Sequence, residues 1–271
     1  MMKDHIGTEK VVHGQQWGSL HNGYFADPII ARPLLNAIID VLTHSPAEVI
    51  VDLGGGTGFL LSQLAAHDIV PALSLKNIDC SKAQLALTDT TGISPVHKSL
   101  EDFKRSDVAA AGQRLFLMMR SVLHYVGENG LQPFLRHIRA QAQEGEFFVH
   151  QTASFDNKDE AACLNALYSY MHTAKWYPMT NELTRYLADS GWRLTNTMAA
   201  PSLLLTSDDL ALRYALDATY LAHIRDKMAR EFGAKNRVFR LTPSGFHAYL
   251  PYRIFTCVAS LSPLDNPFIV V

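Results

Sequence analysis

A glycine-rich stretch near residue 50 carries the clearest chemistry of the sequence. In VIVDLGGGTGFLL, residues 49–61, an apolar run and one acid, Asp52, precede four glycines: Gly54, Gly55, Gly56 and Gly58. Glycines between a buried strand and a helix allow backbone amides to approach a ligand closely, because no side chain intervenes. A second acid, Asp79, ends the next apolar run, about 20 residues further on, where an acid can bind ribose hydroxyls. Together these residues predict a nucleotide-like ligand.

The spacing of the glycines distinguishes this loop from two other kinds of glycine-rich loop, the dinucleotide-binding loop and the P-loop. A dinucleotide loop of the form GxGxxG would need glycine where Phe59 or Leu61 stands. The lysine of a P-loop is missing as well. We therefore disfavour a nicotinamide-dependent oxidoreductase, although the loop alone does not decide the ligand.

The motif Asp52-Leu53-Gly54-Gly55-Gly56-Thr57-Gly58 resembles the first motif of class I S-adenosylmethionine-dependent methyltransferases, and the resemblance covers about residues 49–151. It implies S-adenosylmethionine as cofactor and S-adenosylhomocysteine as product. The glycine loop would lie under the methionine and ribose portions, Asp79 would hold the ribose, and Cys80 would flank the adenine. Family members often place an acid after their third strand, where this chain has Ser99. The adenine contact would then pass to Leu100 or Glu101, and we also assign Arg120 to the cofactor site.

The segment that follows the fourth expected strand indicates the type of transfer. LHYVGENGLQPFLRHI resembles the LHDWSDE-type segment of small-molecule O-methyltransferases, in which the histidine is the general base, and the resemblance assigns that role to His124. Imidazole suits this role because its pKa lies near neutrality. Tyr125 stands where those enzymes have an orienting acid. Transfer to carbon or nitrogen, with His124 only orienting the substrate, stays open, as does a cofactor-binding protein that no longer methylates.

Aromatic and histidine side chains are the expected substrate wall, because methyl transfer depends mainly on positioning and on excluding water. The segment MHTAKWYPM, residues 171–179, lacks regular periodicity and is typical of a pocket loop. The predicted substrate-binding residues are Trp17, Tyr24, Tyr125, His150, His172, Trp176 and Tyr177.

The elements that must position these residues alternate along the first two thirds of the chain. Strand patterns at 48–53, 72–79, 114–119 and 146–151 are separated by helical patterns, which predicts right-handed crossovers and a parallel sheet. We expect an α/β fold, a Rossmann-like doubly wound sheet with an antiparallel hairpin at its C-terminal end. The single domain would comprise a helical cap (1–45), a cofactor-binding core (46–200), a helical insertion or lid (201–245) and a final strand and tail (246–271).

Composition limits the partners of this domain. The net charge of −2 and the absence of a Pro-Pro motif argue against a nucleic-acid methyltransferase, although residues 225–240 carry a basic run in which one arginine could face an anionic group. No apolar run approaches the ~20 residues of a membrane span, so we expect a cytoplasmic protein with a small-molecule substrate. Cys80, Cys163 and Cys257 are widely spaced, and no paired histidine spacing predicts a metal. The oligomeric state, a homodimer included, stays open.

Overall fold

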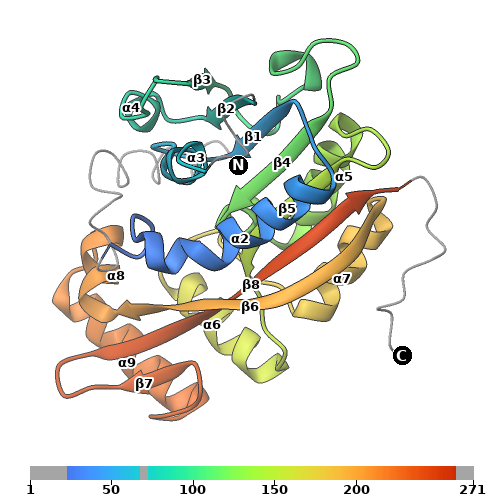
Figure 1. Ribbon diagram of the computed structural model, residues 1–271. Helices are drawn as coiled ribbons and strands as arrows, with labels where there is room; N and C mark the ends of the chain where they lie inside the picture. Colours follow the sequence, from blue (N-terminus) through green and yellow to red (C-terminus); the bar gives the residue numbers. More distant parts are fainter. Residues whose placement is uncertain (1–22, 68–72, 261–271) are drawn as a thin grey trace.

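The computed structural model describes residues 23–67 and 73–260, which form an eight-stranded mixed sheet (Figure 1). The strand order is β3-β2-β1-β4-β5-β8-β6, and β7 pairs with β8. The first five strands run parallel: β1 (Val49–Leu53), β2 (Ser74–Asp79), β3 (Ile93–His97), β4 (Leu115–Arg120) and β5 (Phe147–Ala153). The last three pair antiparallel: β6 (Trp192–Thr206), β7 (Phe239–Leu241) and β8 (Phe246–Ala259). This topology confirms the predicted fold class.

Helices cover both faces of the sheet because its central strands are apolar on both sides. Ile50 of β1 packs with α2 (Pro28–His44) and α3 (Phe59–Ala65), whereas Val49 and Val51 face the cluster that includes α5 (Gly127–Gln141) and α7 (Thr180–Asp189). This alternation follows from the two-residue period of a strand. The remaining helices are α4 (Lys82–Leu85), α6 (Lys158–Tyr170), α8 (Ser207–Tyr214) and α9 (Ala218–Phe232), with short 3₁₀ turns η2 (Arg105–Asp107) and η3 (Leu123–Val126).

The strands β6 and β8 continue past the parallel strands and carry α8, α9 and β7 between them (Figure 1). Residues of this extension share a second hydrophobic cluster with α6 and with Tyr24 and Phe25, which precede α2. The predicted boundary between core and lid at 200/201 falls inside β6, at the register shift between Ala200 and Leu203. The extension is therefore continuous with the sheet.

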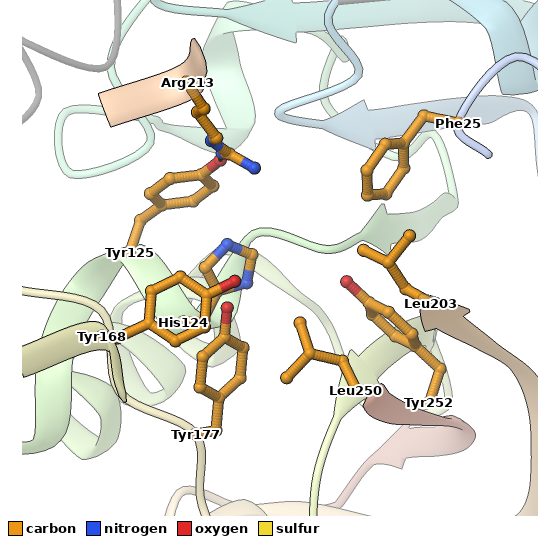
Figure 2. Close-up of a pocket in the computed structure, with 9 residues that line it drawn as sticks. All are labelled: Phe25, His124, Tyr125, Tyr168, Tyr177, Leu203, Arg213, Leu250 and Tyr252. Atoms are coloured by element: carbon orange, nitrogen blue, oxygen red, sulfur yellow. The ribbon is translucent and has the colours of Figure 1, made fainter. Parts of the chain in front are cut away.

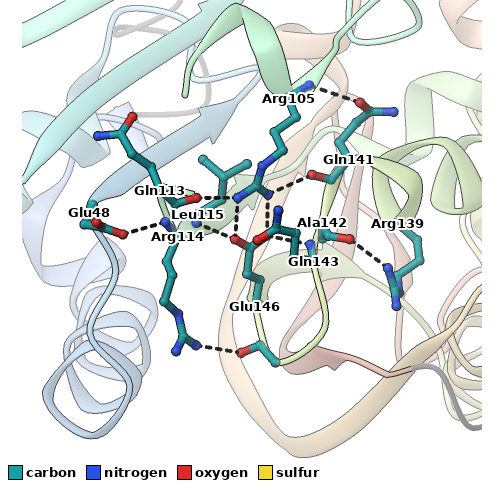
Figure 3. Close-up of polar contacts among 11 residues, drawn as sticks. Glu48, Arg105, Gln113, Arg114, Leu115, Arg139, Gln141, Ala142, Gln143 and Glu146 are labelled. Carbon is teal, nitrogen blue, oxygen red and sulfur yellow. Dashed lines mark hydrogen bonds and ion pairs between the residues drawn. The ribbon is translucent and has the colours of Figure 1, made fainter. Parts of the chain in front are cut away.

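A network of polar contacts closes the amino-terminal end of the sheet (Figure 3). Glu146, just before β5, accepts two hydrogen bonds from the Arg105 guanidinium, at 2.7 and 2.8 Å. Its oxygens also accept the backbone N–H groups of Leu115 and Gln143, each at 2.7 Å. The two oxygens of this buried carboxylate thus accept four hydrogen bonds in all.

No helix in the described part of the chain is long and apolar enough to cross a membrane. Within the same residues, no group of three or more histidine, cysteine, aspartate or glutamate side chains is placed to hold a metal ion.

Candidate active site

The glycine loop leaves β1 in a backbone conformation that only glycine adopts easily. Gly54, Gly56 and Gly58 have φ values of 74°, 58° and 77°, in the left-handed region. Space is equally restrictive: a Cβ on Gly54 would lie 2.8 Å from a Val122 methyl group, and one on Gly55 would lie 2.5 Å from the Asp52 carboxyl. The loop is therefore packed directly against the side chains that follow β4 and those within β1.

Asp79, at the end of β2, lies against this loop as the sequence predicts. Its carboxylate accepts the Gly56 N–H at 3.0 Å and the Ser81 N–H at 2.7 Å. The side chain is half-buried, and both of its oxygens accept backbone N–H groups beside the loop.

Asp52 presents a different kind of carboxyl group below the loop. It is 1% exposed, and no described residue donates a hydrogen bond to either of its oxygens. Burial raises its pKa to about 7; the nearby charge of Asp79 acts in the same direction, and Arg120 opposes it. A buried acid without hydrogen bonds is costly, which marks the position as one that a ligand can complete.

The other predicted cofactor residues lie around the loop at different depths. Leu100 is half-buried, with a methyl group 3.7 Å from the Cβ position of Gly54. Ser99 and Cys80 are half-buried as well, whereas Glu101 is exposed. Arg120 is near enough for its charge to act on Asp52, and its guanidinium donates to the carbonyl oxygens of residues 24 and 25, each at 3.2 Å, which ties the segment before α2 to the end of β4.

A narrow pocket opens beside η3; its cavity volume is about 10 Å³, and the empty space reaches about 230 Å³ only when the open solvent at its mouth is included (Figure 2). Ser121, at φ 60°, turns the chain out of β4, and His124 on η3 is 5% exposed. The His124 ring stacks on Tyr177 at 5.2 Å between centroids and lies 4.1 Å from the Tyr125 ring. The pocket is lined by Phe25, His124, Tyr125, Tyr168, Tyr177, Leu203, Arg213, Leu250 and Tyr252.

Only part of the predicted substrate wall meets at this pocket. Tyr125 and Tyr177 line it, and Tyr24 stacks on the lining residue Tyr252 at 5.8 Å. Trp176 is half-buried against the main core and contributes its backbone N–H to the His124 carbonyl oxygen at 3.1 Å. Trp17 lies outside the described residues.

The structure does not support a substrate contact for His150 or His172. His150 lies on the core face of β5, stacked on Phe148 and on Phe255 of β8, and burial lowers its pKa to about 3. The two-residue period of the strand places it there, on the same face as Phe148. His172 is exposed, and its ring nitrogen lies 2.7 Å from the Tyr220 hydroxyl.

The predicted site residues include three of the nine lining residues, and four of the other six lie far along the chain: Leu203, Arg213, Leu250 and Tyr252. They come from β6, α8 and β8, far along the chain from His124. No spacing pattern signals such a gathering. The pairing of β6 with β8, which brings Leu203 opposite Leu250, is what assembles this wall.

Solved structures with the same architecture are methyltransferases and related proteins. A proposed methyltransferase from Bacillus halodurans is 11% identical over 84% of this chain and 99% of its own, with a TM-score of 0.63. The 1,6-didemethyltoxoflavin N1-methyltransferase of Burkholderia thailandensis, solved with S-adenosylhomocysteine, is 14% identical over 96% and 91%, with a TM-score of 0.54. The [4+2]-cyclase SpnF is 12% identical over 86% and 82%, with a TM-score of 0.52.

The chain has the class I methyltransferase fold. No protein-family model and no curated protein sequence matches it. Within the methyltransferase fold, β1, the glycine loop and the end of β2 lie side by side at the carboxyl ends of the parallel strands. Ligands of open α/β sheets bind at such ends.

Proposed function

We propose that the chain transfers a methyl group from S-adenosylmethionine to a hydroxyl oxygen of a small molecule, with His124 as general base. The observation that carries this proposal is the contact between the glycine loop and the segment after β4. Val122 packs on Gly54, and His124 follows two residues later at the wall of the pocket. A cofactor held by the loop and an acceptor held by the pocket would therefore be neighbours.

The loop residues suit the chemical groups of this cofactor. The Asp79 carboxylate, at the end of β2 and against the loop, is a suitable acceptor for the hydroxyls of a ribose. The unbonded carboxyl of Asp52 lies in a region where positive charge would be favourable. When bound, S-adenosylmethionine supplies a methyl group already activated on a sulfonium sulfur. The protein then has to position the acceptor, exclude water and accept one proton.

Of the nine lining residues, His124 has the side-chain type that most often serves as a general base. Phenols ordinarily ionise near pH 10, and burial raises the pKa of both Tyr177 and Tyr252 above that value. Arg213 stays protonated at any ordinary pH. The imidazole of His124 is thus the candidate base for an acceptor hydroxyl.

The cofactor can be tested first by titration calorimetry with S-adenosylmethionine, S-adenosylhomocysteine and NADH. We expect micromolar binding of the two adenosyl ligands and none of NADH. Asp79→Ala should weaken that binding by about 10-fold or more, because a charge-assisted hydrogen bond is lost. Asp89→Ala is the matched control, since Asp89 is exposed and its carboxylate accepts the N–H of the nearby Thr91. Binding of NADH alone, or equal affinities in the two variants, would contradict the assignment.

The base can be tested with a panel of phenols and hydroxy acids, measuring release of S-adenosylhomocysteine. His124→Ala should lower kcat by about 100-fold or more while keeping cofactor affinity. Its rate should recover as the pH rises, because the acceptor hydroxyl then ionises without help. The exposed His44 on α2 provides the control variant His44→Ala. Unchanged turnover in His124→Ala, or a loss that is equal at every pH, would indicate transfer to carbon or nitrogen with an orienting histidine.

A non-methylating reaction is the second candidate, because a [4+2]-cyclase shares this fold. It predicts cofactor binding of the same strength and no release of S-adenosylhomocysteine with any acceptor. A single methylated product from the panel would exclude it.

A further inference from the structure

Asp52 and Asn77 bring two buried oxygen atoms together beneath the glycine loop. The residues are register partners on β1 and β2, so their side chains lie on the same face of the sheet. They are 1% and 0% exposed. Oδ2 of Asp52 and Oδ1 of Asn77 lie 2.5 and 2.4 Å from one point, the place that a Cβ on Gly55 would occupy. Both oxygens are hydrogen-bond acceptors when Asp52 is ionised.

The orientation of the Asn77 amide is fixed by a backbone carbonyl group. Its Nδ2 donates to the Gly56 carbonyl oxygen at 3.0 Å and to the Thr88 hydroxyl at 2.9 Å. A carbonyl oxygen only accepts, so the reversed amide would place two acceptors against each other at Gly56. Oδ1 is therefore held on the side of Gly55, toward Asp52, and no described residue donates a hydrogen bond to it.

Two adjacent acceptors without a donor are unfavourable unless one of them carries a proton. Both Asp52 oxygens and the Asn77 Oδ1 lack a donor among the described residues. An ionised Asp52 would hold a negative charge beside the negative end of an amide dipole, in a buried place. A protonated Asp52 has one O–H group to donate, and Asn77 Oδ1 is the adjacent acceptor. A single proton then gives both side chains a hydrogen bond.

The charges that act on Asp52 come from the ends of two neighbouring strands. Asp79 on β2 favours the protonated form, and Arg120 on β4 opposes it. The guanidinium of Arg120 donates to the carbonyl oxygens of residues 24 and 25, so it does not supply the missing donor. The helix α3, which begins directly after the loop, has no titratable side chain. Burial has the largest effect and raises the pKa of Asp52 to about 7.

From this geometry we propose that Asp52 donates a proton to Asn77 Oδ1 in the ligand-free protein, and that Asp52 releases this proton when a positively charged ligand binds at the glycine loop. The O–H bond of Asp52 breaks, its electron pair stays on the carboxylate, and the proton passes to the buffer. Asn77 is a positioning residue, because it presents the acceptor that keeps the acid neutral. The inference rests on the proposed function, since it concerns the same cofactor site.

Three adenosyl ligands separate the possible sources of the positive charge. S-adenosylmethionine carries a sulfonium and an ammonium group, S-adenosylhomocysteine carries the ammonium group alone, and 5′-methylthioadenosine carries neither. All three contain adenosine. A difference in proton release among them therefore reports the charge of the ligand and not the filling of the site.

The test counts released protons by titration calorimetry of the full chain at pH 6.0, in two buffers that differ in ionisation enthalpy. We expect about one proton to be released for each S-adenosylmethionine bound, because a group with a pKa of about 7 is mostly protonated at this pH. Equal release with S-adenosylhomocysteine assigns the charge to the ammonium group, and release with S-adenosylmethionine alone assigns it to the sulfonium. With 5′-methylthioadenosine we expect no release.

Asp52→Asn imitates the protonated acid, because its amide N–H can donate to Asn77 Oδ1. It should bind 5′-methylthioadenosine as the wild type does, bind the charged ligands about 10-fold or more weakly, and release no proton. The control is Asp89→Asn, which changes an exposed acid and should match the wild type. Asn77→Ala should lower the number of protons released at pH 6.0, because the neutral form of Asp52 loses its hydrogen bond. Thermal unfolding shows whether each variant is folded, and the wild-type proton count stands without them.

An ionised Asp52 that shares a bridging water with Asn77 is the main competitor, because a water can donate to both oxygens. It predicts no proton release at pH 6.0, and that result would overturn the inference. Equal release with 5′-methylthioadenosine, or from Asp52→Asn, would overturn it as well, and undiminished release from a folded Asn77→Ala would remove the role of Asn77. A failure of the proposed function looks different. In that case neither S-adenosylmethionine nor S-adenosylhomocysteine binds.

Discussion

A buried glutamate and a buried aspartate lie at opposite ends of the same sheet, and they differ in the number of hydrogen bonds that their carboxyl groups accept. Glu146, at the amino-terminal end, accepts hydrogen bonds from Arg105, Leu115 and Gln143 (Figure 3). Asp52, near the carboxyl end of β1, is 1% exposed and accepts none from the described residues. The first carboxylate joins η2, β4 and β5 within the protein. The oxygens of the second accept no hydrogen bond from the described part of the protein.

The difference separates the part of the fold that provides stability from the part that provides function. Breaking a satisfied buried ion pair is costly because its partner is left uncompensated. A buried carboxyl without hydrogen-bond partners already lowers the stability of the wild-type protein, and groups of this kind are typical of functional sites. We therefore expect substitutions at the amino-terminal end to unfold the protein, and substitutions at the carboxyl end to change ligand binding and pH dependence.

The largest effect is expected for Glu146→Ala. It leaves the largely buried Arg105 guanidinium and two backbone N–H groups without their acceptor, and should lower the free energy of unfolding by about 3–5 kcal/mol. Urea denaturation measures this loss. Asp156→Ala, which removes an exposed partner of Arg253, should cost less than about 1 kcal/mol. Similar losses in the two variants would remove the contrast between the satisfied network and an ordinary surface pair.

Asp52 should make the stability of the ligand-free protein depend on pH. Its pKa is raised to about 7 by burial, so the folded state holds a proton that the unfolded state releases near pH 4. The contribution of Asp52 to the free energy of unfolding is then fully present below about pH 4 and is lost as the pH rises toward 7, by on the order of 4 kcal/mol in total. Asp52→Asn should abolish this fall.

Denaturation at pH 5 and pH 8 measures the effect of Asp52, and the exposed Asp89 gives the control variant Asp89→Asn. If wild type and Asp52→Asn lose the same stability between these pH values, the carboxyl is not held in its protonated form.

A smaller effect is expected for Gly54→Ala, which tests the packing of the loop against Val122. Its positive φ and the 2.8 Å approach of the Val122 methyl group should together cost about 2–3 kcal/mol. Gly92→Ala isolates the backbone cost, because Gly92 has φ 88° and open space around its Cβ position; about 1 kcal/mol is expected there. Urea denaturation of the two variants measures the difference. Equal costs would mean that Val122 moves aside easily.

Several elements could be predicted because their signals are local. Asp27 caps α2 through the Ile29 N–H, as its place before Pro28 indicates. The apolar run at 114–119 forms the buried β4. The helix α6, in contrast, was not predicted: it ends at Tyr170, directly before the segment 171–179 that is expected to be a loop. Its buried face packs against α9, which local periodicity does not show.

By itself, the sequence determined the parallel α/β core, the glycine loop and the position of Asp79 beside it, because strand period, left-handed glycines and the acid after the second strand act over a few residues. Only the tertiary structure decided which polar groups meet at the pocket. Arg213 and Tyr125, 88 residues apart, are joined by the extension that β6 and β8 carry, while His150 is turned into the core by the strand that holds it. Contacts over such separations depend on strand pairing and on the packing of whole elements, which no short pattern contains.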